Sequence, residues 1–263
     1  LHYKNNKYFF QRDGVKSRFV EVISENKYKL EKGQLVKAQL IKYNKNKKAK
    51  IIEIIGNIRS VNELNKYIAK KNNLDLNFSD RVEKEAERVS NQEINTNDRK
   101  DLRNINFITI DPDDAMDHDD AIWASKDPDP SNKNGWLLKI AIADVSFYVK
   151  KDSPIDKEAL NRCFSVYLPN TVIPMLPFNL SNNLCSLKHS HDRPAIVVDI
   201  CIDSVGKILN YKFNKALINV SANLDYKEFN KFMKNETKFN NYNPLKQTIN
   251  DLINSYSSLK KSK

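Results

Sequence analysis

The first part of the chain alternates short runs of apolar and polar residues, which predicts β-structure. Strands are expected at Arg18–Ile23, Gln34–Tyr43 and Ala49–Ile55, where β-branched residues alternate with polar ones. Turn signals lie at Asp13-Gly14 and at Glu31-Lys32-Gly33. A segment with this many short strands closes most naturally into a small barrel of the OB or cold-shock type.

After the predicted strands, the spacing of apolar residues becomes typical of helices. Ser60 and Glu63 have the spacing of a capping box, which predicts that a helix begins there. A second helix is expected over Asp80–Ser90, because its apolar residues recur on one helical face. We therefore interpret residues 1–57 as the barrel and residues 58–100 as a helical linker.

The remainder, residues 101–263, mixes both kinds of element. Strands are expected at Ile105–Ile110, Trp136–Val149, Arg193–Ile202 and Lys207–Leu217, with a turn at Asn134-Gly135. Helices are expected from Pro154 to about Val166, at Tyr226–Met233 and at Pro244–Lys260. The predicted fold class is α+β, with an N-terminal OB-like barrel followed by an α+β domain.

Composition narrows the class of protein. The 263 residues are 40% hydrophobic and 29% charged, which excludes a wholly disordered chain. The sequence has no run of about 18 apolar residues, so we expect no membrane span. Cys163, Cys185 and Cys201 are far apart and form no C-x-x-C pair, so we expect reduced thiols in a cytoplasmic protein.

Charge is unevenly distributed along the chain. Residues 1–60 contain 15 Lys and Arg against 5 Asp and Glu, whereas residues 101–150 contain 5 against 10. A basic module before an acidic centre suits an enzyme that acts on a polyanion with metal ions. A solvated lysine-rich face is the alternative. Tyr8, Phe9 and Phe10 could stack on bases or fill the barrel, and both interpretations are open.

Six aspartates fall within ten residues immediately after an apolar strand: Asp111, Asp113, Asp114, Asp117, Asp119 and Asp120. Two carboxylates about 4 Å apart repel by roughly 4 kcal/mol at an effective dielectric near 20, so convergence requires a compensating cation. Carboxylate oxygens select Mg²⁺, Mn²⁺ or Ca²⁺, and the missing glycine argues against an EF-hand. A plain acidic surface loop is the alternative, although apolar residues interleave the acids.

These aspartates also carry a family resemblance. Ile110-Asp111 and Asp117-x-Asp119-Asp120-Ala121 resemble the signature of the ribonuclease II and ribonuclease R family, the RNB domain. Further matches follow in the family's order: Ile142–Ser146, Tyr167–Pro169 with Ile173–Pro177, Leu184–Leu187, and Arg193-Pro194. The resemblance implies a processive 3′-to-5′ exoribonuclease that releases nucleoside 5′-monophosphates from single-stranded RNA with Mg²⁺, with Mn²⁺ as an alternative metal.

The resemblance also implies roles for single residues. The aspartates that would hold Mg²⁺ and act in catalysis are Asp111, Asp117, Asp119 and Asp120, with Asp119 the least replaceable. Tyr167 would stack on terminal bases. Arg193 would contact the substrate, although a structural ion pair is equally consistent with its position. His118, often apolar in the family, is given no catalytic role.

The family's domain continues beyond the length of this chain, so we expect an incomplete catalytic domain that is weakly active or inactive alone. Expected partners are 3′ ends of single-stranded RNA, with no DNA substrate, no membrane and a monomeric state. One rival hypothesis is a non-catalytic RNA-binding module with an incomplete nuclease domain. Another is a basic protein associated with ribosomes or membranes, which would bind any polyanion in a salt-dependent manner.

Overall fold

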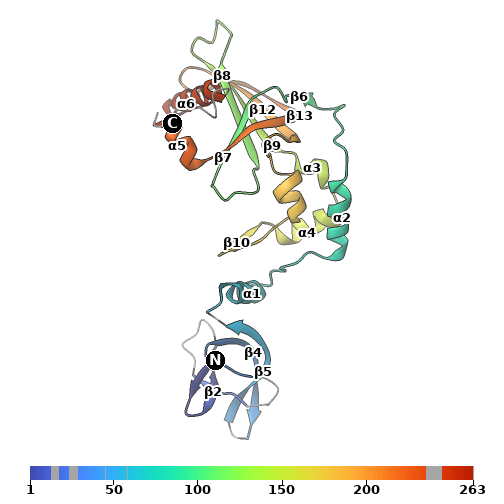
Figure 1. The fold of residues 1–263 in the computed structure, drawn as a ribbon, viewed down its shortest axis with the longest axis vertical. Coiled ribbons are helices and arrows are strands. Elements are labelled where there is room, and N and C mark those ends of the chain that lie inside the picture. Colours follow the sequence, from blue (N-terminus) through green and yellow to red (C-terminus); the bar gives the residue numbers. More distant parts are fainter. Residues whose placement is uncertain (13–17, 24–28, 45, 58, 235–244, 263) are drawn as a thin grey trace. The chain divides into compact units, whose positions relative to one another are not determined.

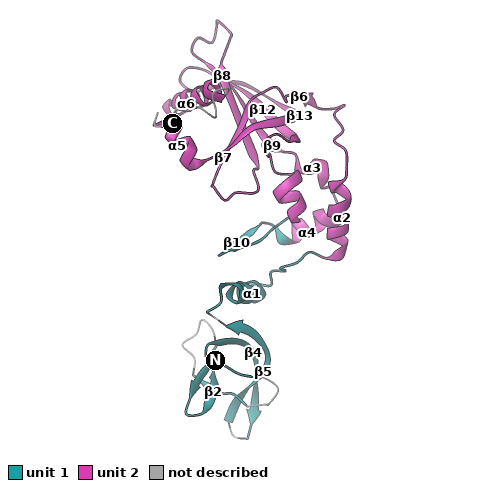
Figure 2. Cartoon of the chain, in the orientation of Figure 1, with its two compact units in different colours: residues 1–78, 162–175 teal, residues 79–161, 176–263 magenta. Residues whose placement is uncertain are grey.

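The computed structural model describes the chain in six stretches: residues 1–12, 18–23, 29–44, 46–57, 59–234 and 245–262. It divides into two compact units (Figure 2), unit 1 with residues 1–78 and 162–175, and unit 2 with residues 79–161 and 176–263. These units differ from the predicted domains, because residues 162–175 join the N-terminal part. Among the described residues, no helix is both long and apolar enough to cross a bilayer.

The N-terminal part of unit 1 consists of short strands, as predicted (Figure 1). They are β1 (His2–Lys4), β2 (Lys7–Phe10), β3 (Val20–Glu21), β4 (Gln34–Tyr43) and β5 (Asn46–Asn57). Antiparallel pairing gives one sheet β1-β2-β3 and one hairpin β4-β5, connected by a bridge between Val22 and Ala49. The described pairings leave two sheets, so closure into a barrel stays a prediction. The predicted turn at Asp13-Gly14 lies outside the described residues.

A small core holds these strands together. Val22, Ala49 and Ile51 are buried, and Tyr8 and Phe10 pack against them. The Tyr8 hydroxyl also donates a hydrogen bond to the Leu30 carbonyl. Residues two apart in a strand share a face, so Tyr8 and Phe10 point to the same side. Their packing favours the interpretation that these two aromatic residues fill the core.

Helix α1 (Val61–Lys71) begins at the predicted cap. The Ser60 hydroxyl accepts a hydrogen bond from the Glu63 amide at 3.4 Å. The Glu63 carboxylate, however, accepts from the Asn57 amide rather than from the amide of Ser60. Only the first hydrogen bond of the capping box therefore forms. The Glu63 carboxylate, which would make the second one, instead connects the helix to the end of β5.

Unit 1 also contains a hairpin that the sequence did not predict. Strands β10 (Val166–Leu168) and β11 (Thr171–Ile173) pair antiparallel. Asn170 adopts a φ of 59°, which a tight turn requires. The Asn65 side chain donates to the Pro169 carbonyl at 2.7 Å and holds the turn against α1. The helix predicted to reach Val166 therefore ends earlier.

Unit 2 is built around one sheet. Its strands are β6 (Lys100–Asp101), β7 (Phe107–Asp111), β8 (Asp120–Lys126), β9 (Trp136–Ala143), β12 (Asp192–Ile202) and β13 (Ile208–Asp225). The strand order is β12-β9-β8-β7-β13-β6, and β13 also pairs with β12 (Figure 1). Residues 208–219 of β13 pair with β12, and residues 216–217 pair also with β6. Residues 220–225 pair with β7. Starting from β12, the pairings therefore run through β9, β8, β7 and β13 and come back to β12.

The helical elements of unit 2 are α2 (Asp80–Ser90), α3 (Val145–Tyr148), α4 (Pro154–Arg162), the π-helical turn η1 (Leu180–Leu184), α5 (Tyr226–Met233) and α6 (Lys246–Lys261). Helices α2 and α5 have the predicted bounds, and α6 lies within two residues of its prediction. Val82, Ala86 and Val89 are buried on one face of α2, as their spacing predicted. The Ser153 hydroxyl accepts from the Asp156 amide at 3.2 Å and starts α4 as predicted.

The predicted strand Trp136–Val149 is wrong in its second half. Strand β9 ends at Ala143, and α3 begins at Val145. The reason is the Asp144 carboxylate, which accepts from the Ser146 hydroxyl and from Arg99, both at 2.6 Å. The chain leaves the sheet at this residue, and apolar periodicity gives no sign of the contact with Arg99.

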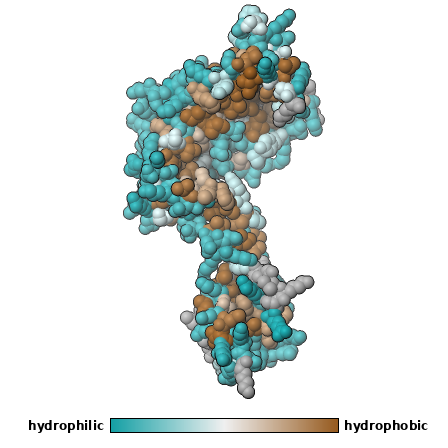
Figure 3. All heavy atoms as spheres, turned by 180° about the vertical axis from the view of Figure 1, so that it is seen from behind, coloured by the Kyte–Doolittle hydropathy of each residue, from teal (hydrophilic) through white to brown (hydrophobic). Residues whose placement is uncertain are grey.

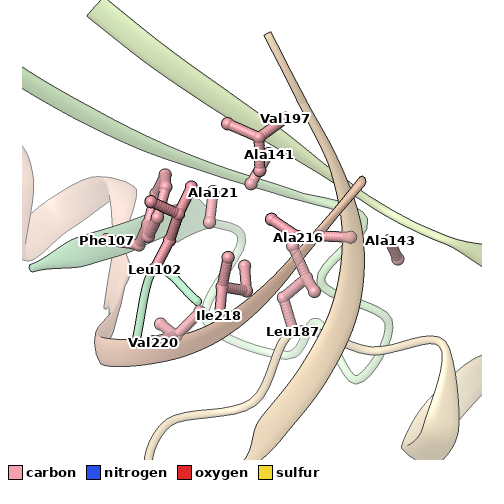
Figure 4. Close-up of a cluster of buried hydrophobic side chains, with 11 residues drawn as sticks. Leu102, Phe107, Ala121, Ala141, Ala143, Leu187, Val197, Ala216, Ile218 and Val220 are labelled. Carbon is pink, nitrogen blue, oxygen red and sulfur yellow. The ribbon is translucent and has the colours of Figure 1, made fainter. Parts of the chain in front are cut away.

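Two buried clusters cover opposite faces of the sheet. The first gathers side chains of β7, β8, β9, β12 and β13 with Leu187 (Figure 4). The second packs the other face against α5 and α6, where a cavity of about 310 Å³ remains. Seen from behind, apolar side chains gather over part of unit 2 (Figure 3). Ala121 belongs to the first cluster, so its neighbour Asp120 is directed to the other face.

Candidate active site

The acidic segment connects two neighbouring strands of the sheet. Asp111 is the last residue of β7, and Asp120 is the first residue of β8. Ile108 pairs with Ile122, which fixes the two strand ends side by side. At the end of the loop, the Ala143 amide donates to the Asp119 carbonyl at 2.9 Å. Strand pairing therefore anchors both ends of the segment.

The four predicted metal ligands form one electrostatic group. Burial raises the pKa of Asp119, and the charges of Asp117, Asp120 and Asp111 raise it further. The pKa of Asp120 is raised by burial and then by Asp111. The charges of Asp111, Asp117 and Asp120 thus all act on Asp119, and the charge of Asp111 acts on Asp120.

Asp113 is held differently. Its carboxylate forms an ion pair with Lys227 of α5, and this hydrogen bond lowers the pKa of Asp113. Asp113 and Asp114 are exposed, as are Asp119 and Asp120, so the difference lies in the ion pair and not in exposure. A lysine already compensates Asp113, so it differs from the repelling group although it lies in the same loop.

His118 contacts a predicted metal ligand. Its Nδ1 lies 2.7 Å from Asp111 Oδ2 and 3.5 Å from Thr109 Oγ1. Asn223 of β13 donates to Thr109 Oγ1 at 2.9 Å and to the Leu187 carbonyl at 3.0 Å. The polar network was not predicted from the sequence, in which the one local signal is a threonine within the apolar run Phe107–Asp111. His118 therefore orients Asp111.

The donor set fits a hard divalent cation. Carboxylate oxygens are the preferred ligands of Mg²⁺ and Mn²⁺, and a cation would relieve the repulsion that raises the pKa of Asp119 and Asp120. Within the described residues, no three His, Cys, Asp or Glu side chains already converge as a metal-binding group. In this structure the contact from His118 falls on Oδ2 of Asp111.

Arg193 is buried, with 7% of its surface exposed, and burial lowers its pKa. Its Nε donates to the Ser186 carbonyl at 3.0 Å, and its Nη2 donates to Asn183 Oδ1 at 3.2 Å. Its Nη1 donates to the Asp192 carbonyl at 3.1 Å. These contacts favour the structural interpretation, with neutral oxygens in place of the expected ion pair. Substrate contact by Arg193 stays a prediction.

Tyr167 lies on β10 of unit 1 and is 67% exposed. It pairs across the hairpin with Val172. The stacking on terminal bases that the resemblance implies needs an exposed ring, and it stays a prediction. The aspartates lie in unit 2, so the two predicted parts of the site belong to separate compact units.

The three cysteines are free thiols. Cys185 and Cys201 are buried, and burial raises the pKa of Cys185 to about 12 and that of Cys201 to about 11. Cys163 is exposed. A thiol with a raised pKa is a poor nucleophile, so the two buried cysteines are packing residues.

The sequence of this chain matches a known protein family. A family model described as the RNB domain matches residues 99–263. The chain belongs to the RNB family. The matched range contains the whole aspartate loop, β6 to β13 and the helices around them. It begins at Arg99, the residue that pairs with Asp144.

The RNB domain of this chain is similar to curated ribonucleases. Ribonuclease R of Thermotoga maritima is 37% identical over 231 residues, which are 84% of this chain and 31% of the relative. Ribonuclease R of Vibrio parahaemolyticus is 42% identical over 166 residues, which are 63% of this chain and 19% of the relative. The chain therefore spans about a fifth to a third of the length of these relatives.

Solved structures agree with this membership. RNase R of Mycoplasma genitalium in complex with double-stranded RNA matches with a TM-score of 0.78 and 28% identity, over 92% of this chain and 44% of that chain. Yeast Ssd1, described as a pseudonuclease, matches with a TM-score of 0.59 and 16% identity, over 86% of this chain and 30% of that chain. At that identity the likeness to Ssd1 concerns the fold alone.

Proposed function

We propose that this chain is part of a processive 3′-to-5′ exoribonuclease that uses Mg²⁺ to hydrolyse single-stranded RNA to nucleoside 5′-monophosphates. The observation that carries the proposal is the group of mutually repelling aspartates at adjoining strand ends of an RNB domain. The ribonuclease R relatives support the choice of RNA as substrate.

The aspartates would act as metal ligands. Asp111, Asp117, Asp119 and Asp120 would hold the cation, with Asp111 and Asp120 offered from strand ends and Asp117 and Asp119 from the loop. Bound Mg²⁺ would supply an activated water and stabilise the leaving oxygen of the scissile phosphate. The hydrogen bond from the Ala143 amide to the Asp119 carbonyl attaches Asp119 to the end of β9.

Unit 1 would contribute to substrate binding through its charge. The hairpin β4-β5 contains several lysines, among them Lys37, Lys42, Lys47 and Lys48. Neutralisation of phosphates by lysine releases counterions, so binding of RNA should weaken steeply as salt is raised. The M. genitalium protein, whose printed descriptions include complexes with RNA, supports this part of the proposal.

We expect the 263 residues alone to be weakly active or inactive. They span only part of the ribonuclease R relatives. The family resemblance implies that a second base-clamping aromatic and a catalytic arginine lie outside the stretch seen here. The parent protein would then be the active enzyme.

The deciding experiment follows a 5′-labelled single-stranded RNA with and without Mg²⁺. The 263-residue chain is compared with a form extended to the complete catalytic domain. Stepwise shortening from the 3′ end by the extended form supports the proposal. RNA binding without cleavage by either form would replace it with the non-catalytic binding module, and robust cleavage by the short chain would refute the expected inactivity.

Replacement of Tyr167 by alanine should weaken binding of single-stranded RNA by about 10-fold, because one stacked base contributes roughly 1–3 kcal/mol. The measurement is fluorescence anisotropy with a labelled RNA in the absence of metal. Tyr256→Ala on α6 is the matched control, since that ring is 51% exposed in unit 2. Equal losses in both variants, or none in Tyr167→Ala, would contradict the stacking role.

A further inference from the structure

A serine from a distant segment holds the centre of the aspartate loop. Ser186 Oγ accepts a hydrogen bond from the His118 amide at 3.0 Å and donates one to the Met116 carbonyl at 3.0 Å. These two backbone groups lie on either side of Asp117. One hydroxyl therefore satisfies a donor and an acceptor of the loop at once, across 70 residues of sequence.

The serine is itself fixed. Its residue is fully buried, with 0% exposure. Arg193 Nε donates to its carbonyl at 3.0 Å, and its amide donates to the Asn183 carbonyl at 3.1 Å. The next residue, Leu187, donates its amide to the His118 carbonyl at 2.8 Å. The hydroxyl thus belongs to a rigid segment rather than to a mobile side chain.

Without the hydroxyl, the loop would lose specific restraints. The His118 amide and the Met116 carbonyl, which are partly buried, would lose this partner, and each would have to find water or another partner through movement of the backbone. Residues 116–118 are the part of the loop that would move. Asp117 lies within this part, and Asp119 follows directly after it.

We propose that Ser186 is a positioning residue, which holds Asp117 and Asp119 where they can bind a divalent cation, and that Arg193 supports it through the Ser186 carbonyl. The inference rests on the proposed function, because it assigns metal binding to the aspartates. Mutation of residues that hold metal ligands in place, without contacting the metal, typically lowers metal affinity by about 10- to 100-fold.

The test uses the full 263-residue chain and three variants. Ser186→Ala removes the hydroxyl, and Ser186→Thr retains it. Ser255→Ala is the matched control, because Ser255 is 2% exposed and its hydroxyl also donates to a backbone carbonyl, that of Leu252 at 2.9 Å. Two quantities are measured: amide hydrogen exchange at His118 and Leu187, and the dissociation constant of Mn²⁺.

In Ser186→Ala, we expect exchange of the His118 amide to accelerate by about 10- to 100-fold and the Mn²⁺ dissociation constant to rise by about 10-fold. Ser255→Ala should change neither, and Ser186→Thr should restore both. If Ser186→Ala does not fold, the comparison of Ser186→Thr with the wild type still decides whether retention of the hydroxyl preserves both quantities.

Two results would overturn the inference. Unchanged Mn²⁺ affinity in Ser186→Ala, with Mn²⁺ bound normally by the wild type, refutes the positioning role alone. No Mn²⁺ binding by the wild type refutes the metal assignment beneath it, and hydrogen exchange then reports only a structural clamp. The two failures are therefore distinguishable.

Discussion

Replacement of Asp119 by asparagine should lower Mg²⁺-dependent RNA degradation by the extended catalytic domain about 10²- to 10³-fold or more, the range seen when one group that stabilises transition-state charge is removed. Asp119 lies at the point where the charges of Asp111, Asp117 and Asp120 combine. The neutral amide would weaken the hold on the cation. The measurement is the rate of 3′-end shortening of a 5′-labelled RNA.

The control is another aspartate of the same loop. Asp113 is paired with Lys227 and lies outside the repelling group, so Asp113→Asn should retain most of the activity. RNA binding should be the same in both variants. Equal activity of Asp119→Asn and Asp113→Asn would remove the metal assignment and favour a binding module.

The stability of Asp119→Asn separates loss of chemistry from loss of folding. The folded protein raises the pKa of Asp119, so its ionised form is disfavoured in the folded state. The contribution of Asp119 to stability therefore falls as pH rises from its ordinary range through the raised pKa. Asparagine does not ionise, so at neutral pH without metal the variant should be at least as stable as the wild type in thermal unfolding.

Local patterns were enough to predict several elements of this fold. The spacing of Val82, Ala86 and Val89 predicted α2 and its buried face, and the density of acids after Ile110 pointed to the candidate site. Each of these patterns lies in or directly beside the element that it predicts. Family membership, predicted from ordered motifs, is confirmed by the match over residues 99–263.

What the sequence could not predict depends on contacts between distant residues. The strand β9 ends at Ala143 because Asp144 pairs with Arg99, 45 residues earlier. The aspartate loop is held by Ser186, and nothing near either residue signals the contact. Tyr167 and the aspartates both lie in the matched RNB range, residues 99–263, yet they belong to different compact units. Apolar periodicity indicates which face of an element is buried, but it does not indicate which polar side chains form hydrogen bonds with one another.

The buried pair Arg99–Asp144 should have the largest effect on stability. Nη2 of Arg99 lies 2.6 Å from Asp144 Oδ2, and the two side chains are only 4% and 3% exposed. Arg99→Ala would leave a buried carboxylate without its counter-charge, which typically costs about 3–5 kcal/mol. Chemical unfolding of unit 2, followed by circular dichroism, should show this loss. The exposed pair Lys215–Asp98 is the control, and Lys215→Ala should cost less than about 1 kcal/mol.

The pH dependence provides an independent check of the same pair. Burial alone would raise the pKa of Asp144, but hydrogen bonds from Ser146 and Arg99 outweigh it and lower the pKa. In the wild type, the stability that Asp144 contributes is present above its unfolded pKa and is lost as pH falls through its folded pKa. In Arg99→Ala, burial prevails and reverses the sign, so the loss of stability should shrink as pH is lowered toward 4. A loss that is independent of pH would mean that Arg99 stabilises the fold through packing on Phe147 rather than through charge.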